Sequence, residues 1–545
     1  MSDTQKKEQI YWYSYSEENL KKAQHENKSI FLFIYNSHSQ WFQKMQEESF
    51  NDSVIIELLN ARFIPILVNK DEHPDIERYY HKVYTLMNRE TTGSPLSLFL
   101  TAKLEPFYAG SFIPAQDIDD QLSLESLLRI ISKKYITDYD TLAQKGQEVL
   151  SHINVQDKSI QATKLNSTIT QTIQQHVEKL LDPQFGGFSK APKFPNTTTL
   201  HLLFDLYQLE HNEQILNAIT LSLDNMIKGG FYDLENGGFY QYSKDSAWKE
   251  PYTVKTTYDN AQLIELYLRA YAISKNEKYK NVAFQSINFM LAQRKHTKFF
   301  SLENEIIITS WNALMVKALF LASSFDKKYQ VHALETLEAI LSELYVSGTL
   351  YHTKEINEKA HVKAVLEDYS SLGETLIIAY QNTLDESFLI MATQFTNLIV
   401  EQYYEQARWV YSTGNFKVRE NIHDIDIPSS IASAVSLLLS IASLVDNNYK
   451  KFVFKTLELH SFTLMRQPLS SPKLTQMLLR YLKDDIIIKS NENLLKKHID
   501  EKEEFSYPYV YFKIVKQENL NIDNSHSTLR TEKTFEEVKQ YLKNL

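Results

Sequence analysis

Polar and charged side chains that could do chemistry gather in a few short stretches of this sequence. The stretch "YDNAQL" carries Asp259 with Gln262 three residues later, and "LEDY" carries the adjacent carboxylates Glu367 and Asp368. Residues three apart lie on one face of a helix. Paired carboxylates do acid–base work when their environments push their pKa values apart. These carboxylates, Asp259, Glu367 and Asp368, are therefore our candidates for catalysis.

Side chains near these carboxylates in the expected fold could contact a ligand. Aromatic rings provide platforms for sugars, and lysine or amide side chains provide hydrogen bonds. The candidates for substrate binding are Lys193, Lys255, Tyr258, Asn260, Gln262, Trp311 and Asn312. Asp259 and Asn260 could equally be first-turn polar residues of a helix with no further role.

A second region of interest is "SHSQWFQKMQEESF", which follows the apolar run "SIFLFIY". The start of a helix after a strand stabilises an anion, yet no cysteine stands there. A nucleophilic Ser39 would need a general base, and side chains at neighbouring helix positions, such as His38, do not face each other. We therefore favour a capping or surface role for Ser39 and a packing role for Phe42.

A metal site is the third possibility. Asp71, Glu72 and His73 stand together just before Pro74. Such a cluster could bind a metal ion, but adjacent residues in a loop before a proline are more typical of a solvated helix start. We predict no metal and no cofactor.

Composition limits the classes of protein to consider. The 545 residues include no cysteine, which excludes disulfides, thiolate catalysis and zinc–thiolate sites. The formal charge of −10 is spread without a clustered basic face, so we expect no nucleic-acid partner. No apolar run is long enough to span a membrane, and the polar N-terminus lacks a secretory signal. We expect a cytoplasmic protein without a membrane partner.

The first part of the chain alternates strand and helix patterns. Residues 29–35 and 62–70 are expected strands, and Ser37 with Gln40 suggests a capping box before the next helix. A helix begins at Pro74, two neighbouring strands follow, and a last helix covers 116–134. This order is that of a thioredoxin fold, so we predict an α/β thioredoxin-like domain over 1–140.

Beyond residue 155 the pattern becomes helical. Paired helices are expected at 160–181, 197–210, 212–228, 256–274, 276–293, 309–324, 327–346, 363–383, 386–405, 428–445, 448–462 and 472–483. Loops rich in glycine and aromatic residues recur between them and suggest short β-hairpins. We predict an all-α (α/α)6 toroid over 155–490, with these loops at one mouth of a central cavity, and a strand and helix extension over 491–545.

These motifs resemble a family that joins a thioredoxin-like domain to a six-hairpin glycosidase-like domain, known in animals as a spermatogenesis-associated thioredoxin-like protein. "GGFSKAPKFP", "YDNAQL" and "TSWNALM" are similar or identical to family motifs. The resemblance places Pro95 at the thioredoxin-fold cis-proline, and Ser39 and Phe42 at the two cysteines of the family's redox motif.

This chain also departs from the family pattern. Tyr252 and Val254 stand where the family has histidine and glutamate, and Ile431 replaces an asparagine. We therefore expect a redox-inactive protein with a possible carbohydrate-binding role in the toroid cavity. The alternatives are a carbohydrate-acting enzyme, such as an epimerase, isomerase or glycosidase-like protein, and a pseudoenzyme scaffold whose protein partner binds the thioredoxin-like groove around Trp41 and Pro95.

Overall fold

The structure, a computed structural model, describes residues 9–118, 121–153, 162–294, 297–302 and 306–545. The chain divides into two compact units. Unit 1 comprises residues 1–158 together with the short segment 414–419, and unit 2 comprises the rest. The segment 414–419 lies inside the range we expected for the toroid, but Phe416 packs against Tyr15 and Tyr79 of unit 1.

Unit 1 is built on one mixed sheet of four strands. These are β1 (Ser29–Tyr35), β2 (Phe63–Asn69), β3 (Leu96–Leu100) and β4 (Pro106–Gly110). Their order is β2-β1-β3-β4, with β1 parallel to β2 and β3 antiparallel to both β1 and β4. This arrangement confirms the thioredoxin-like fold.

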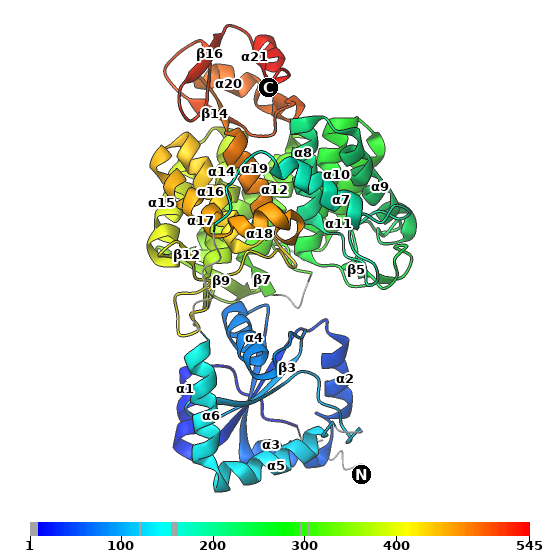
Figure 1. Cartoon of the computed structure of the whole chain (residues 1–545), viewed down its shortest axis with the longest axis vertical. Helices are drawn as coiled ribbons and strands as arrows, with labels where there is room; N and C mark the ends of the chain where they lie inside the picture. Colours follow the sequence, from blue (N-terminus) through cyan, green and yellow to red (C-terminus); the bar gives the residue numbers. More distant parts are fainter. Residues whose placement is uncertain (1–8, 119–120, 154–161, 295–296, 303–305) are drawn as a thin grey trace. The chain divides into compact units, whose positions relative to one another are not determined.

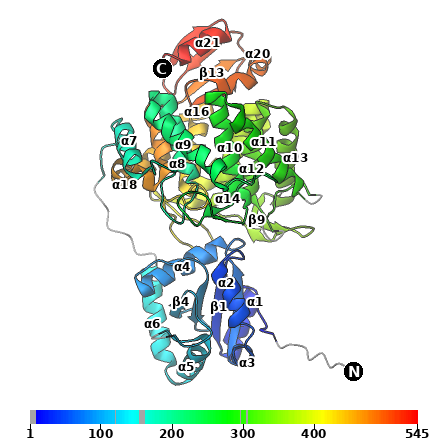
Figure 2. The ribbon, with the colours of Figure 1, turned by 90° about the vertical axis from the view of Figure 1, so that its right-hand side faces the viewer.

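Helices cover both faces of this sheet (Figures 1 and 2). They are α1 (Glu17–Glu26), α2 (Gln40–Glu48), α3 (Ser53–Arg62), α4 (Pro74–Asn88), α5 (Leu124–Thr137) and α6 (Tyr139–His152). Because side chains alternate across a strand, Phe31 and Phe33 pack with α2, α3 and α5. Ile30 and Leu32 pack on the opposite face with α1 and α4.

Three local expectations for unit 1 were wrong. Helix α2 begins at Gln40 with Ser39 as its N-cap, so Ser37 and Gln40 form no capping box. The last predicted helix begins only at Leu124, because the hydroxyl of Ser123 caps it there. Helices α1 and α6 were not predicted.

Within the described residues, unit 2 contains twelve main helices, most of which match the predicted segments closely. The helix predicted at 160–181 begins only at Ile169, and residues 160 and 161 lie outside the described residues. The inner helices are α8 (Thr197–Glu210), α10 (Thr257–Ser274), α12 (Thr309–Ser323), α14 (Leu366–Thr383), α16 (Ser430–Leu444) and α19 (Pro472–Lys483). The outer helices are α7 (Ile169–Leu180), α9 (Glu213–Gly229), α11 (Glu277–Ala292), α13 (Lys328–Ala339), α15 (Glu386–Tyr403) and α17 (Lys450–Leu459), with the short α18 (Ser461–Arg466) beside α7.

The inner helices form a closed ring. Each packs against the next in the order α8, α10, α12, α14, α16 and α19, and α19 packs back against α8. The helical (α/α)6 toroid is thereby confirmed. Short turns lead from each of the first five inner helices to the next outer helix, whereas long loops lead back to the starts of α8, α10, α12, α14 and α16. All inner helices therefore begin at the end of the barrel that carries the long loops.

The long loops contain short strands, but not always the predicted hairpins. β5 (Tyr242–Ser243) pairs with β6 (Pro251–Tyr252), and β11 (Tyr404–Glu405) with β12 (Arg408–Trp409). In contrast, β7 (Ile306–Ile308) pairs with β9 (Thr349–Glu355) from the following loop. β9 also pairs with β8 (Tyr345–Val346) and β10 (Val362–Lys363). The loops are thus joined to one another by pairing between loops, which sequence alternation does not specify.

The C-terminal extension is larger than the predicted strand and helix. It contains β13 (Ile486–Ser490), α20 (Glu492–Lys497), the 3₁₀ helix η4 (Ile499–Glu504), β14 (Val510–Ile514), β15 (Leu520–Asp523), β16 (Thr528–Glu532) and α21 (Phe535–Leu542). Its four strands form one sheet at one end of the helical barrel (Figures 1 and 2). We call residues 486–545 the C-terminal module.

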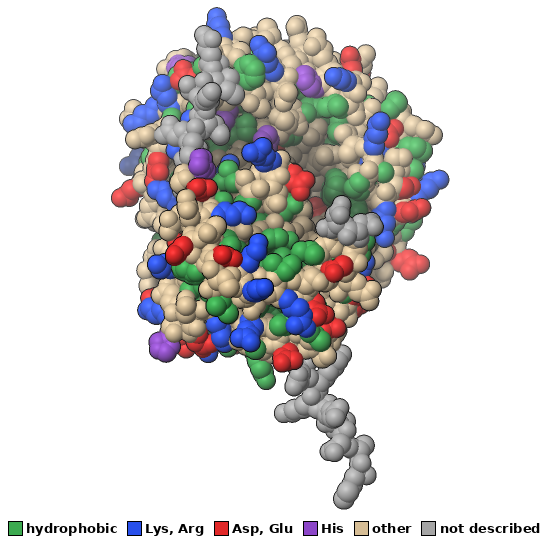
Figure 3. Space-filling view, turned by 60° about the horizontal axis from the view of Figure 1, so that its bottom comes forward, with side chains coloured by type: hydrophobic (Ala, Val, Ile, Leu, Met, Phe, Trp, Pro, Cys, Tyr) green, Lys and Arg blue, Asp and Glu red, His purple; other side chains and the backbone are tan. Residues whose placement is uncertain are grey.

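In the part of the chain that the structure describes, no helix combines the length and the apolar character needed to cross a membrane. The face of the molecule in Figure 3 carries acidic and basic side chains side by side, in line with the even charge distribution of the sequence.

Candidate functional site

The degenerate redox position in unit 1 is occupied by structural side chains. The Ser39 hydroxyl accepts the backbone N–H of Phe42 at 3.4 Å and donates to the Ser94 carbonyl at 3.1 Å. Phe42 is buried and stacks on Tyr35 with ring centroids 4.4 Å apart. The Ser94–Pro95 peptide bond is cis, as the resemblance implied. Trp41 is 53% exposed and touches Phe112, so an apolar surface remains beside the former redox site.

Two predicted ligand-binding residues, Asn260 and Asn312, anchor long loops to inner helices. The Asn260 amide accepts the N–H of Phe239 at 2.8 Å and donates to the Phe239 carbonyl at 3.1 Å. Asn312 bonds Phe300 in the same way, at 2.7 and 3.1 Å. Both amides are fully buried and also donate to the carbonyl four residues earlier. The structure thus places both asparagines in loop anchors rather than on a cavity wall.

Lys193 and Lys255 each pair with the aspartate of a glycine-rich turn. The Lys193 ammonium bonds Asp182 at 2.6 Å and the Ser246 carbonyl at 2.7 Å. The Lys255 ammonium bonds Asp233 at 2.8 Å and the Gly237 carbonyl at 2.7 Å. Each aspartate also accepts two backbone N–H groups of its own turn. These lysines therefore hold the two turns closed.

The remaining polar and aromatic candidates lie at the starts of inner helices. Tyr258 and Trp311 meet edge to face, with centroids 4.9 Å apart, and are only 6% and 9% exposed. Gln262 accepts the Thr197 hydroxyl at 2.8 Å and donates to the Asp426 carbonyl at 3.1 Å. This end of the barrel is therefore densely packed around the aromatic pair.

The three catalytic candidates each have hydrogen-bond partners. Asp259 accepts the Thr256 hydroxyl at 2.6 Å in the first turn of α10. Glu367 accepts the hydroxyls of Ser310 at 2.7 Å and Tyr411 at 3.1 Å.

Asp368 is fully buried, where it contacts Nδ1 of His352 at 2.9 Å and accepts the Val365 N–H at 3.0 Å. Glu367 and Asp368 thus point to different partners, and none of the three carboxylates lines either of the two cavities described for this structure.

A cavity of about 760 Å³ lies at the other end of the barrel, where the inner helices finish. Every inner helix contributes at least one side chain to its wall, and residues 502–511 of the C-terminal module line it as well. We call it the axial cavity. None of the ten candidates named from the sequence for catalysis or binding lines it.

The axial cavity is lined by charges of both signs. Its acidic residues are Asp205, Glu265, Glu374, Glu503 and Glu504, and its basic residues are Arg269, Lys275, Lys317, Lys473, Arg480 and Lys502. Some of these charges are paired directly. Arg269 bonds Asp205 at 2.6 Å, and Glu374 lies between Lys317 at 3.8 Å and Lys473 at 3.6 Å.

Other polar groups in the cavity have no direct partner. Within the described residues, the carboxylate of Glu265 makes neither a hydrogen bond nor an ion pair. The amide oxygen of Gln476 is buried without a hydrogen bond, although its nitrogen donates to Asp205 at 2.8 Å. Buried polar groups normally have partners, so this wall offers groups that a polar ligand could satisfy.

Neighbouring positive charges keep the carboxylates of Glu265 and Glu374, at the centre of the axial cavity, ionised. Burial by itself raises the pKa of Glu374, but the ammonium groups of Lys317 and Lys473 more than offset it, and the pKa is lowered. The pKa of Glu265 is lowered for the same reason, against burial, by His201, Lys317 and Arg269. Burial raises the pKa of Glu503, at the edge that the C-terminal module supplies.

The sequence contains a signal for these residues. Lys317 is the one charged residue in helix α12, and Glu374 is the one charged residue of α14 beyond its first turn. A charge inside a buried helix requires a partner or a polar cavity. The motifs in the sequence point instead to residues at the starts of these two helices: Trp311 and Asn312 in α12, and Glu367 and Asp368 in α14. In the described parts of the chain, no three His, Cys, Asp or Glu side chains converge in a way that could hold a metal ion.

Residues 3–154 match the family Thioredox_DsbH, described as "Protein of unknown function, DUF255". The N-terminal domain is a DUF255 domain. The chain is also similar to spermatogenesis-associated protein 20 of Mus musculus, with 32% identity over 308 residues that make up 54% of this chain and 38% of the mouse protein. The chain therefore spans well under half the length of that relative.

An uncharacterised protein of Caenorhabditis elegans is 29% identical over 277 residues, covering 50% of this chain and 38% of the worm protein. Among solved structures, a sugar epimerase from a ruminal bacterium covers 54% of this chain and 85% of its own, with a TM-score of 0.46 and 16% identity. The DUF255 domain here lacks every cysteine, so thiol redox chemistry is excluded for this chain.

Proposed function

We propose that this protein binds a neutral, hydroxyl-rich ligand of the carbohydrate class in the axial cavity and performs no thiol chemistry. The observation that carries the proposal is the cavity itself: about 760 Å³, within the range of small-molecule sites, and lined from every inner helix. Acidic and basic side chains are nearly balanced on its wall. A neutral ligand whose hydroxyls both donate and accept suits such a wall better than an ion of either sign.

The two central carboxylates, Glu265 and Glu374, by themselves support binding rather than hydrolysis; the carboxyl group on the cavity wall whose pKa is raised is that of Glu503. Glycoside hydrolysis needs one carboxyl group kept protonated and one ionised. Glu265 and Glu374 both have lowered pKa values because they face ammonium and guanidinium groups. Both are therefore ionised near neutral pH and act as hydrogen-bond acceptors.

The test is a thermal-shift screen of the full chain against neutral monosaccharides and disaccharides. Glu265→Gln removes a charge from the axial cavity, and Trp311→Ala, the matched variant, opens the loop end of the same barrel. A ligand present at 100 times its dissociation constant stabilises the native state by about 2.7 kcal/mol. We expect a sugar-dependent shift in the wild type and in Trp311→Ala, and its loss in Glu265→Gln.

The other outcomes separate the alternatives. A shift lost in Trp311→Ala and kept in Glu265→Gln would move the site to the loop end, around the residues named from the motifs. No shift with any sugar would refute the proposal and direct the search to a protein partner at Trp41 of the DUF255 domain.

A further inference from the structure

The C-terminal module repeats the sheet of the DUF255 domain. In the module β13 is parallel to β14, β13 is antiparallel to β15, and β15 is antiparallel to β16, in the order β14-β13-β15-β16. The DUF255 sheet has the same three strand pairings, in the order β2-β1-β3-β4. A helix follows the last strand in each case, α21 and α5.

The module lacks one helix of that fold. Helix α4 connects β2 to β3 in the DUF255 domain, whereas only residues 515–519 connect β14 to β15. This short connection is held across the end of β13, because Val515 donates to the Ser490 carbonyl and Asn491 donates to the Gln517 carbonyl. The sheet face that such a helix would cover is therefore available to the barrel.

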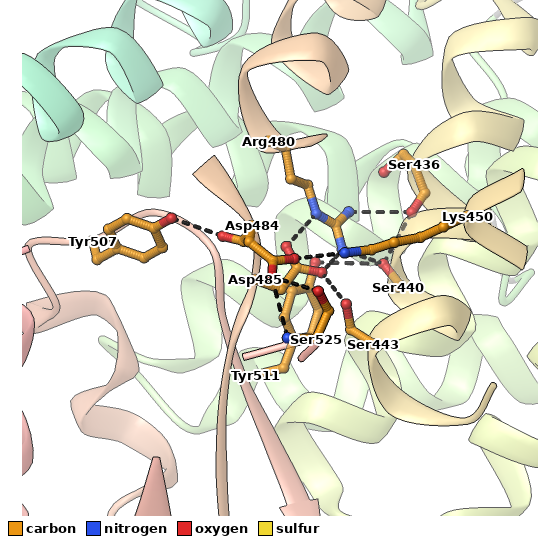
Figure 4. Close-up of polar contacts among 10 residues, drawn as sticks. All are labelled: Ser436, Ser440, Ser443, Lys450, Arg480, Asp484, Asp485, Tyr507, Tyr511 and Ser525. Carbon is orange, nitrogen blue, oxygen red and sulfur yellow. Dashed lines mark hydrogen bonds and ion pairs between the residues drawn. The ribbon is translucent and has the colours of Figure 1, made fainter. Parts of the chain in front are cut away.

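Polar contacts fix the C-terminal module, and Asp485 just before it, to the inner helices. Arg480 of α19 forms a bidentate ion pair with Asp485, both bonds at 2.7 Å, and donates to Ser436 and Ser440 of α16 (Figure 4). Burial would lower the pKa of Arg480, but Asp485 raises it, so the pair is ionised. From α14, the buried Gln381 amide bonds both the N–H and the carbonyl of Phe512 in β14.

This attachment places η4 over the axial cavity. Helix η4 packs against α10 and α14, and its residues Lys502 and Glu503 line the cavity. Within the described residues neither side chain makes a hydrogen bond or an ion pair. The Lys502 ammonium lies 5.5 Å from the centre of the Tyr511 ring. Charged groups facing a cavity without ion-pair partners cost stability, so a structural role does not account for them.

We propose that residues 486–545 are a second thioredoxin-like module, reduced by one helix, that closes the barrel and presents Lys502 and Glu503 to the ligand of the axial cavity. An ammonium donor beside a carboxylate acceptor can bond two neighbouring hydroxyl groups of a sugar. This inference rests on the proposed function for its ligand, but its effect on the free protein can be measured without one.

The test compares the double variant Lys502→Met, Glu503→Gln with a matched control, Lys516→Met, Glu518→Gln. The control changes the same residue types in the same module at exposed positions that do not line the cavity. We expect the cavity variant to raise the unfolding midpoint of the ligand-free protein by about 1–2 °C, because two charges without partners are removed. Its affinity for the sugar found in the screen should fall about tenfold or more.

The outcomes are distinct from those of the proposed function. A fall in the ligand-free midpoint would show that Lys502 and Glu503 are structural and would overturn the inference, whether or not any sugar binds. Unchanged affinity in the cavity variant, with binding lost in Glu265→Gln, would overturn it and leave the proposed function standing. A raised midpoint in the cavity variant alone supports it even if no sugar in the screen binds.

Discussion

Ser39 is the residue at which loss of redox chemistry can be followed in physical terms. Its hydroxyl accepts an N–H in the first turn of α2, which is the role of an N-cap. Phe42, one turn later, fills the space between β1 and α2 by stacking on Tyr35. Ser39 and Phe42 therefore stabilise the domain at the two positions where the family's redox motif has reactive cysteines.

Ser39→Ala should destabilise the DUF255 domain by about 1 kcal/mol, since the first turn of α2 loses its cap. Chemical denaturation followed by the fluorescence of Trp12 and Trp41 would measure the change. Ser37→Ala is the control, because the Ser37 hydroxyl makes no hydrogen bond in the described structure. Equal losses in both variants would contradict the capping role.

At the scale of elements, one device recurs three times in unit 2. A buried side-chain amide bonds both the N–H and the carbonyl of a phenylalanine in a separate segment: Asn260 with Phe239, Asn312 with Phe300, and Gln381 with Phe512. The amide replaces the backbone partner that a strand or loop would otherwise need. The inner helices thereby hold two loops at one end of the barrel and the C-terminal module at the other.

Asn260→Ala should cost about 2–4 kcal/mol, because the N–H and carbonyl of Phe239 become buried without partners. Thermal unfolding of unit 2 would measure it. Asn236→Ala, in the exposed turn of the same loop, should change the midpoint little. If Asn260→Ala were as stable as the wild type, the anchor would be unimportant and a ligand-binding role for Asn260 would gain weight.

At the scale of the whole molecule, one buried ion pair lies where the barrel passes into the C-terminal module, between Arg480 of α19 and Asp485 just before β13. Arg480 and Asp485 are 3% and 2% exposed, and Ser443 and Ser440 complete the hydrogen bonds around them (Figure 4). Breaking one partner of a buried pair leaves an uncompensated charge, which is far more costly than losing both.

Arg480→Met should therefore destabilise unit 2 by about 3–5 kcal/mol, and Arg480→Met with Asp485→Leu should recover part of that loss. Hydrogen exchange would show increased opening of β13 and β14 in the single variant. If the double variant were no more stable than the single one, an uncompensated charge would not be the cause.

Much of the fold could be predicted from local sequence signals. Helices α8 and α19 were predicted with their observed ends, 197–210 and 472–483, because helix periodicity and the residues at their boundaries act over short distances. The strand at 29–35 was predicted to the residue for the same reason. The cis-proline and the loss of thiol chemistry likewise followed from residue types at known motif positions.

The site was harder to predict because it depends on contacts between distant residues. The sequence by itself determined most of the helices of unit 2, the thioredoxin-like order of elements and the absence of redox chemistry, all of which are local or compositional. Only the tertiary structure decided that the asparagines of the motifs anchor loops and that the cavity lies at the opposite end of the barrel. Asp205 and Gln476 meet there across 271 residues of sequence, and a wall assembled from scattered side chains of six helices leaves no contiguous motif to recognise.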